Sequence, residues 1–320
     1  MKAAVYTQYG PPEIVKILEV EKPVPKETEV LIRVHASTVN RTDCGFRGAN
    51  YFIVRFWSGM MRPRVQILGC EFAGDIKAVG SKVKDFCTGD RVFGFNDVNF
   101  GGHGEYMLMD EKGPMALIPE GLSYEEAAPI VEGSHYALCD LRAAKLEAGQ
   151  KILINGATGA IGSAAVQLAR YFGAEVTAVC ATQHIQLVEA LGANRVIDYT
   201  KEDFTLLNTE FDIVFDAVGK SSFAKCKPLL KRKGVYMSTE LGYMSQNPFL
   251  ALVTPMLGGK KLLFPIPTID KEDVLFLKEL VETKQFKPVI DRSYPLEEIV
   301  EAYTYVETGF KTGNVVITLA

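Results

Sequence analysis

The sequence lacks an uninterrupted apolar run of the roughly 18 residues that a membrane-spanning helix requires. It also lacks internal repeats and low-complexity tracts. The first residues, Met1 to Tyr6, lead directly into a strand pattern instead of the apolar core of a signal peptide. We therefore expect no membrane partner and a cytoplasmic location.

Closely spaced cysteine pairs are absent as well, because the 6 cysteines are scattered along the chain. This pattern predicts reduced thiols and argues against a structural zinc knuckle. Basic residues are not in excess, since the formal net charge is −4, so we expect no nucleic-acid partner. What is present is a chain of 320 residues, 48% hydrophobic, which is long enough for two globular domains.

The most informative segment is a strand, a glycine-rich turn, a helix and a second strand over residues 151–180. This βαβ unit binds dinucleotides, since its glycines let the backbone approach the pyrophosphate and its helix N-terminus attracts phosphates. The alternative is a glycine-rich turn with a packing role only. The predicted cofactor contacts in the turn are Gly156, Ala157, Thr158, Gly159, Ala160 and Ile161.

The residues after the second strand bear on the choice of cofactor. An NAD site usually places a carboxylate about 20 residues past the glycines, on the adenosine ribose. This chain has no carboxylate there until Glu189, whereas Thr182, His184 and Tyr199 offer hydrogen-bonding groups that suit a 2′-phosphate. The pattern predicts NADPH over NADH. The alternative is a loose preference at ordinary strand-end polar residues, and no arginine is present to decide the matter.

The character of the chain changes near residue 122. Short strands punctuated by glycine and proline precede this point, and alternating helices and strands follow it. The pattern of a helix and a strand after residue 286 is again similar to that of the first part of the chain. We expect a domain of residues 1–121 and 286–320, with a cofactor domain of residues 122–285 inserted between them.

Several motifs resemble the medium-chain dehydrogenase/reductase superfamily. Residues 68–95 (LGCEFAGDIKAVGSKVKDFCTGDRVFGF) are similar to its G-x-E-x-x-G and G-D-R-V stretch. Residues 156–162 (GATGAIG) match the glycine turn of its quinone-reductase branch, and residues 312–319 (TGNVVITL) are like its closing strand. The resemblance implies an α/β protein, with a GroES-like β-barrel catalytic domain and a Rossmann domain built on a doubly wound parallel sheet.

Two departures from the zinc alcohol dehydrogenases concern the metal sites. By resemblance, the positions that hold the three catalytic zinc ligands in those enzymes are occupied here by Asn40, Cys70 and Ile130. Residues 93–109 also lack the cysteines of the structural zinc lobe. One thiol does not make a site with three protein ligands. The resemblance therefore implies the zinc-independent, zeta-crystallin-like quinone oxidoreductase branch, with no metal ligands.

The candidate catalytic residues are Asn40, Asp43 and Ser134. Without zinc, a conjugated acceptor is favoured because it spreads the negative charge that follows hydride transfer. The family position of Asn40 implies a contact with the acceptor oxygen, although Asn40 could equally cap a turn before Asp43. Asp43 is expected to orient its loop rather than to act as an acid. The resemblance places the Ser134 hydroxyl at the nicotinamide ring.

The resemblance implies further cofactor contacts at strand ends. These are Ala217, Val218 and Gly219, together with Thr239 and Asn314. For each of them the alternative is a loop residue that contacts no ligand.

We therefore expect an NADPH-dependent, zinc-independent reductase of a quinone or an α,β-unsaturated carbonyl compound, an enone or alkenal. The alternatives are a zinc-free alcohol or aldehyde dehydrogenase and a non-catalytic NADPH-binding interaction protein. A basic cluster at residues 225–233 is interpreted as a solvated helix end. The resemblance makes a homodimer plausible, through edge strands of the cofactor domain.

Overall fold

A computed structural model describes residues 1–49 and 54–319, apart from the side chain of residue 57. It separates into two compact units: Met1–Glu132 with Ile269–Ala320, and Gly133–Thr268. These divisions differ slightly from the boundaries expected at 121/122 and 285/286. Residues 122–132 and 269–285 join the first unit because their helices pack on its strands β3, β4 and β7.

The first unit is built on a sheet in the order β14-β15-β3-β4-β5-β7, with β6 paired to β3 and a separate β1-β2 hairpin. Strand β3 is its centre, because β6 pairs with residues 29–33, β15 pairs with residues 36–39, and β4 covers the other edge. The strands are β1 (Lys2–Val5), β2 (Lys16–Glu19), β3 (Glu29–Val39), β4 (Glu71–Val79), β5 (Arg91–Phe95), β6 (Tyr106–Asp110), β7 (Met115–Leu117), β14 (Ile290–Pro295) and β15 (Asn314–Thr318).

Helices of the first unit begin where the sequence supplies caps. Ser123 and Glu126 form a reciprocal capping box at α3, and Asp270 and Asp273 form one at α9. These side chains satisfy backbone N–H groups that have no partner within the helix. The helices are η1 (Pro12–Ile14), α1 (Arg41–Gly48), α2 (Val54–Ser58), α3 (Tyr124–Ala127), η2 (Ala128–Ile130), α9 (Lys271–Glu282), η8 (Leu296–Glu298) and α10 (Ile299–Glu307), while α4 (Glu132–Ala143) begins at the boundary.

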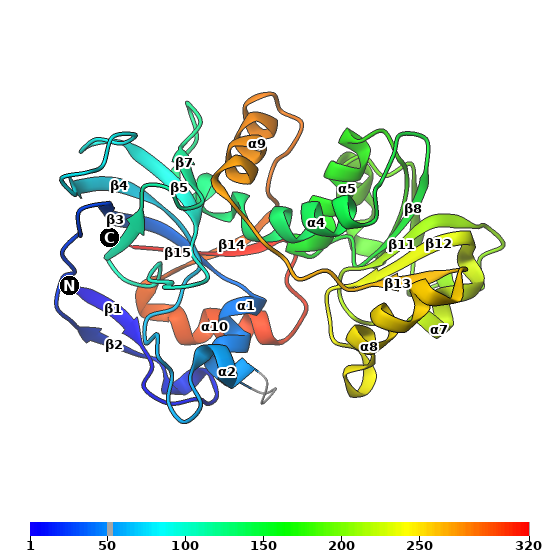
Figure 1. Ribbon diagram of the computed structural model, residues 1–320, viewed down its shortest axis with the longest axis horizontal. Coiled ribbons are helices and arrows are strands. Elements are labelled where there is room, and N and C mark those ends of the chain that lie inside the picture. The colour runs from blue at the N-terminus through cyan, green and yellow to red at the C-terminus, as the bar shows by residue number, and fades with distance from the viewer. Residues whose placement is uncertain (50–53, 320) are drawn as a thin grey trace. The chain divides into compact units, whose positions relative to one another are not determined.

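The second unit holds a six-stranded parallel sheet in the order β10-β9-β8-β11-β12-β13. Figure 1 labels four of these strands, β8, β11, β12 and β13. Counted by position in the chain, this order is 3-2-1-4-5-6, which is that of the Rossmann fold. The expectation of a GroES-like domain plus a doubly wound parallel sheet is confirmed. The strands are β8 (Lys151–Asn155), β9 (Glu175–Cys180), β10 (Arg195–Asp198), β11 (Phe211–Asp216), β12 (Leu230–Ser238) and β13 (Lys261–Leu263).

Helices cover both faces of this sheet, with α5 and α8 on opposite sides (Figure 1). Successive residues of β8, Ile152, Leu153 and Ile154, are all buried, which is the pattern of a sheet covered on both faces. On one of these faces, each strand contributes a buried side chain to a shared core. The core members, one from each strand, are Leu153, Val179, Ile197, Val214, Tyr236 and Leu262. The helices are η3 (Thr182–His184), α5 (Ala160–Tyr171), α6 (Ile185–Ala190), η4 (Phe204–Leu206), α7 (Phe223–Cys226), η5 (Lys227–Leu229), η6 (Tyr243–Ser245), α8 (Gln246–Val253) and η7 (Thr254–Leu257).

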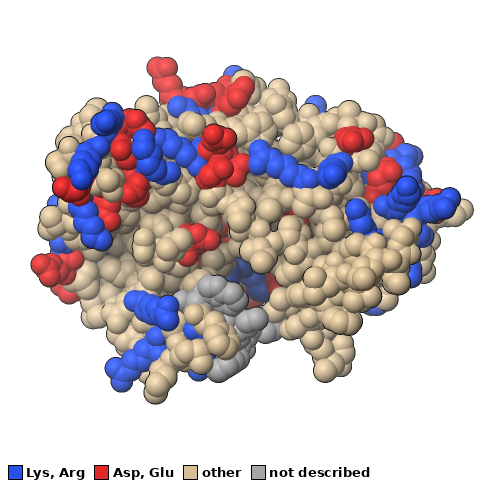
Figure 2. All heavy atoms as spheres, viewed as in Figure 1, with Lys and Arg blue, Asp and Glu red and all other residues tan. Residues whose placement is uncertain are grey.

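One interpretation of the sequence is wrong for the basic cluster, which was assigned to a helix end. Lys225 and Lys227 do lie at the end of α7, but Lys231, Arg232 and Lys233 lie on strand β12, which begins at Leu230. The register of β11 and β12 shifts at this part of the strand, where Arg232 and Lys233 are exposed and Lys231 is half-buried. On the face shown in Figure 2, basic and acidic side chains are intermingled.

No helix among the described residues is long and apolar enough to cross a membrane.

Candidate cofactor and acceptor sites

The glycine turn after β8 requires glycine at two positions. Gly156 has φ +81°, and a Cβ there would lie 2.3 Å from Cγ1 of Val218. A Cβ on Gly162 would lie 2.0 Å from the carbonyl oxygen of Gly156. The turn is therefore packed tightly against the start of α5 and against the loop that follows β11. This is the switch point of the sheet, where dinucleotides bind.

The start of α5 fits a diphosphate. Gly159 is the N-cap residue and, because it has no side chain, makes no capping hydrogen bond to the first-turn N–H groups. A Cβ on Gly159 would meet only the oxygen of Gly156, at 3.8 Å, so space is left beside these donors. Backbone donors with room beside them at a helix N-terminus suit an anionic group. The expected contact residues of the turn, Gly156 to Ile161, thus surround a cradle that a dinucleotide fits.

Asp216, at the end of β11, organises the loop that carries Ala217, Val218 and Gly219. Its buried carboxylate accepts hydrogen bonds from Nδ2 of Asn155 at 3.0 Å, from the N–H of Ser221 at 2.7 Å and from the N–H of Val218 at 3.3 Å. The sequence analysis missed this role of Asp216. The available signal was an aspartate at a strand end directly before the predicted cofactor contacts.

The structure adds a carboxylate from a neighbouring strand to the group of residues after β9. No carboxylate follows β9 before Glu189, but Asp198 ends the neighbouring strand β10 and pairs in register with Cys180. The hydroxyl of Thr182 donates to Asp198, and Thr200 donates to it at 2.6 Å. These hydroxyls hold the pKa of Asp198 well below its usual range, so the carboxylate is ionised. His184 is half-buried in the same turn, and Tyr199, after Asp198, is exposed.

Thr239 and Asn314 lie in different units. Thr239 follows β12 in the second unit, and its N–H donates to the carbonyl of Asp216 at 3.3 Å, so it lies beside the loop of residues 217–219. Asn314 begins β15 in the first unit. Its backbone N–H and its Nδ2 both donate to the carbonyl of Val289, at 2.8 and 3.0 Å. The Asn314 side chain therefore holds a backbone turn, and its expected contact with the cofactor stays a prediction.

Asn40 and Asp43 form a reciprocal capping box at α1. Oδ1 of Asn40 accepts from the N–H of Asp43 at 3.0 Å, and Oδ2 of Asp43 accepts from the N–H of Asn40 at 3.2 Å. Oδ1 of Asp43 also accepts from the N–H of Gly69 at 2.9 Å, which joins the helix to the segment before β4. For Asn40, this capping is the alternative role that the sequence analysis left open. For Asp43, these bonds agree with the expected role of orienting the loop.

The contacts of the Asn40 amide group matter for two questions, namely how an acceptor could bind and whether a metal site exists. Its Nδ2 donates to Sγ of Cys70 at 3.0 Å, and it lies 3.4 Å from Oγ1 of Thr38, at the outer limit of a hydrogen bond. Burial raises the pKa of Cys70 well above its ordinary value, which keeps the thiol protonated.

These residues do not fit a catalytic zinc ion. Of the three family positions, only Cys70 offers a thiol, because Asn40 carries an amide that already donates to that thiol and Ile130 is a buried apolar side chain, whereas a catalytic zinc site needs three protein ligands. Among the described residues, no group of three or more His, Cys, Asp or Glu side chains is arranged to hold a metal.

Buried carboxyl groups gather around this helix start. Glu71 accepts hydrogen bonds from the N–H of Glu132 at 2.6 Å and from the hydroxyl of Thr38 at 2.7 Å. Burial and the neighbouring Glu132 raise the pKa of Glu71, and burial raises the pKa of Asp43 to about 7. Lys311 lies within electrostatic reach of Glu132 and Glu71, while its burial lowers its own pKa. The sequence analysis missed the roles of Glu132 and Lys311, because no local pattern links them to Glu71.

Ser134 lies in the first turn of α4, at the start of the second unit, and is buried.

Comparison with known proteins gives consistent matches over the whole chain. Residues 26–120 match the family model "Alcohol dehydrogenase GroES-like domain", and residues 191–317 match "Zinc-binding dehydrogenase". The chain is 35% identical to a 2-methylene-furan-3-one reductase of Solanum lycopersicum, over 99% of this chain and 79% of that protein. It is 31% identical, with the same coverages, to a chloroplastic NADPH-dependent alkenal/one oxidoreductase of Arabidopsis thaliana. A solved quinone oxidoreductase of Coxiella burnetii superposes with a TM-score of 0.89 at 27% identity, over 100% of this chain and 99% of that one.

Proposed function

The chain belongs to the medium-chain dehydrogenase/reductase superfamily, in its quinone oxidoreductase branch, and from this premise we propose an NADPH-dependent, zinc-independent reductase of quinones or α,β-unsaturated carbonyl compounds. It is an oxidoreductase that uses a nicotinamide cofactor and a small-molecule substrate. The observation that carries the proposal is the set of side chains at the zinc-ligand positions, where an amide, a protonated thiol and an isoleucine replace the metal ligands.

The nucleotide-binding role is assigned to the second unit. The backbone of Gly156 to Ile161 would hold the diphosphate, and Asp216 would position Ala217, Val218 and Gly219 beside it. Thr239, at the next strand end, and Asn314, in the first unit, complete the proposed set of contacts. The bound cofactor supplies the hydride.

The acceptor oxygen is assigned to the amide of Asn40. The weak 3.4 Å contact between Nδ2 and Thr38 leaves one amide hydrogen that an acceptor oxygen could take over without breaking the helix cap. A single neutral donor suits a conjugated acceptor, whose charge is already delocalised after hydride transfer. A saturated ketone would need a stronger electrophile. Asp43 acts as a positioning residue, and Ser134 is proposed to meet the nicotinamide ring.

The preference for NADPH is supported by His184 and Tyr199, which follow β9 and β10, and by the name of the NADPH-dependent relative, whereas the only hydroxyl proton of Thr182 is already donated to Asp198. The charge of Asp198 opposes it. Because two threonine hydroxyls and the N–H of Thr200 already compensate that carboxylate, we propose that the 2′-phosphate is still accepted.

We also propose a homodimer formed through strand β13. This strand is the last in the order of its sheet, and α8 and η7 beside it expose several apolar side chains. The lower right of the face in Figure 2, over α8 and β13, carries few charged groups. The exposed apolar residues are Phe249, Leu252, Met256 and Leu257. Sedimentation of the purified chain tests this point, and a monomer at all concentrations contradicts it.

The function is tested by following NADPH oxidation with a benzoquinone, an enone and a saturated aldehyde in parallel. The proposal expects turnover of the conjugated acceptors, undiminished after treatment with a chelator. Turnover of the aldehyde alone would establish the alcohol dehydrogenase alternative, and NADPH binding with no turnover of any acceptor would establish an interaction protein. One equivalent of zinc in protein purified without added metal would contradict the zinc-independent reading.

A further inference from the structure

The proposed reaction needs a proton donor, and the amide of Asn40 is not one. Hydride addition to a conjugated acceptor leaves a negative charge on the acceptor oxygen, and this oxygen must then gain a proton. The amide stabilises the charge by a hydrogen bond but does not release its hydrogen as a proton. A positioned carboxyl group that holds a proton can supply it, and general acids of this kind accelerate reactions about 100-fold to 10,000-fold.

Asp43, Glu71 and Glu132 are buried carboxyl groups near the start of helix α1, but they differ in their contacts. Asp43 accepts from a backbone N–H group through each of its two oxygens. Glu71 accepts from two backbone N–H groups through Oε1 and from the hydroxyl of Thr38 through Oε2. Both side chains are 0% exposed, whereas Glu132 is 4% exposed. Of the three groups, Glu132 is therefore the one that retains an accessible edge.

Helix α1 places the carboxyl group of Glu132 beside the amide of Asn40. Asn40 is the N-cap residue, and its side chain accepts from the N–H of Asp43, the third residue of the helix. Glu132 accepts from the N–H and from the hydroxyl of Thr42, the second residue, with 2.9 Å between Oγ1 and Oε1. Because the N–H groups of the first turn leave the same end of a helix, the two side chains that bind adjacent N–H groups lie side by side. Cys70, which accepts from the Asn40 amide, is also within electrostatic reach of Glu132.

The surroundings of Glu132 favour its protonated form. Burial raises the pKa of Glu132 above that of an ordinary glutamate, and the charge of Asp43 adds to this effect, whereas Lys311 and the two donors of Thr42 oppose it. Glu71 faces Glu132 as well, and two carboxylates in one buried site do not both ionise readily. Glu132 therefore keeps a proton to a higher pH than an exposed glutamate does, while Thr42 stabilises the carboxylate that remains after proton release.

We propose that Glu132 is a catalytic acid that donates its proton to the acceptor oxygen bonded by the Asn40 amide, and that Thr42 is its positioning residue. The proposal deepens the proposed function and rests on it. One oxygen accepts both hydrogen bonds, because it carries two lone pairs. As the O–H bond of Glu132 breaks, a new O–H bond forms on the reduced acceptor, which becomes an enol or a hydroquinone. Glu132 is left as a carboxylate held by Thr42, and water returns a proton to it at its accessible edge.

The test uses the full chain with NADPH and cyclohex-2-enone. Glu132→Gln keeps an oxygen that accepts from Thr42 but has no acidic proton, so kcat should fall about 100-fold or more. NADPH affinity should stay the same, which also shows that the variant is folded. In the unmodified protein kcat should decline as the pH rises through the neutral range, because the acid must be protonated, and this decline should be absent in Glu132→Gln. An unchanged kcat, or a lower kcat that keeps the same decline, overturns the proposal.

Two substitutions of Thr42 test the positioning role by a second route. Thr42→Val removes the hydroxyl that stabilises the ionised form of Glu132, so Glu132 should hold its proton more strongly and the decline in kcat should move to higher pH. Thr42→Ser keeps the hydroxyl and should leave the decline where it is in the unmodified protein. Identical pH profiles for Thr42→Val and Thr42→Ser overturn the assignment of Thr42 as the positioning residue.

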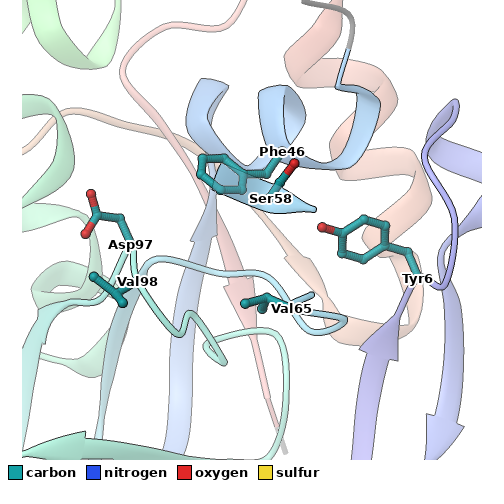
Figure 3. Close-up of a pocket in the computed structure, with 6 residues that line it drawn as sticks. All are labelled: Tyr6, Phe46, Ser58, Val65, Asp97 and Val98. Atoms are coloured by element: carbon teal, nitrogen blue, oxygen red, sulfur yellow. The ribbon is translucent and has the colours of Figure 1, made fainter. Parts of the chain in front are cut away.

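The matched control is a carboxyl group at a cavity further along the same helix. The first unit contains a pocket of about 310 Å³, and both Phe46 of α1 and Asp97 line it (Figure 3). Phe46 follows Thr42 by about 6 Å along the helix axis, at 1.5 Å per residue, so Asp97 is a competing candidate for the acid. Asp97→Asn should leave kcat and its pH profile unchanged. A decline in kcat that is lost in Asp97→Asn and kept in Glu132→Gln would assign the acid to this pocket and overturn the proposal.

The same measurements separate this proposal from the proposed function. Reduction of cyclohex-2-enone by the unmodified protein, at a rate that Glu132→Gln matches, would support the function and overturn the acid. If the unmodified protein reduces no conjugated acceptor with NADPH, the proposed function is contradicted and the assignment of Glu132 fails with it.

Discussion

Asn155 and Asp216 end two neighbouring parallel strands, and Nδ2 of Asn155 donates to Oδ1 of Asp216 at 3.0 Å. The same carboxylate accepts from the N–H of Ser221, so one buried charge ties the loop after β11 to the end of β8. The glycine turn follows β8 directly. Asp216 is therefore placed to set the shape of the cofactor crevice without contacting a ligand itself.

Asp216→Asn should lower the free energy of unfolding by about 2–3 kcal/mol, because it removes a buried charged acceptor from several donors. It should also weaken NADPH binding about tenfold, since the loop of residues 217–219 loses its anchor. Denaturant unfolding and a fluorescence titration measure the two effects. Asp212→Asn is the matched control on the same strand, where a half-exposed pair with Lys231 is expected to contribute about 1 kcal/mol or less. An unchanged NADPH affinity in Asp216→Asn would show that the loop holds its shape unaided.

Asp198 should be a determinant of cofactor choice that acts through its charge. Asp198→Asn removes an ionised group beside Thr182 and should shift the ratio of the two dissociation constants toward NADPH about threefold to tenfold, because the charge that repels a 2′-phosphate is lost. Asp203→Asn is the control, because Asp203 holds Thr205 in a similar exposed turn further along the chain. Paired titrations with NADPH and NADH measure the ratio. A shift toward NADH would place the 2′-phosphate away from this strand end.

Two substitutions separate the role of Asn40 as a helix cap from its proposed role as a hydrogen-bond donor. Asn40→Ala removes both and should cost about 1 kcal/mol of stability, the usual effect of losing an N-cap, together with a fall in kcat. Asn40→Ser keeps an oxygen that can accept from the N–H of Asp43 but lacks the amide donor, so kcat should fall while the Tm is largely retained. NADPH affinity should change little in either variant. If the activity of Asn40→Ser equals that of the unmodified protein, the amide has only a structural role.

Asp43 should make the protein less stable as the pH rises through the neutral range. Its pKa is raised from 3.8 to about 7 by burial. Between these values the unfolded chain has released this proton while the folded protein retains it, so the free energy of unfolding falls with increasing pH until about pH 7. Asp43→Asn cannot titrate, and its stability curve should be flatter over that interval.

Denaturant unfolding at about pH 4, 5.5 and 7 measures this slope. Asp75→Asn is the control, because hydrogen bonds from Tyr124 and His35 lower the pKa of Asp75 and keep it ionised over the same interval. Equal slopes for Asp43→Asn and the unmodified protein would contradict the titration of Asp43.

The amino-acid sequence by itself determined the features that depend on neighbours along the chain. The side chains of Ser123 and Asp270 accept hydrogen bonds from N–H groups three residues ahead, so each cap lies within one short stretch of sequence. The glycine turn and its flanking strands were also predicted from the sequence. Gly156 and Gly162, which approach each other closely, belong to the same short segment of the chain. Periodicity and capping act over a few residues, so a linear pattern records them.

Only the tertiary structure decided which distant groups meet. Asp198 reaches Thr182 from another strand, and its charge at that point follows from the register of β9 and β10. Asn40 meets Cys70 across 30 residues, and Thr42 meets Glu132 across 90 residues. Strand register and packing bring such groups together. Because a side chain's charge state depends on its burial and its contacts in space, the local sequence does not encode it.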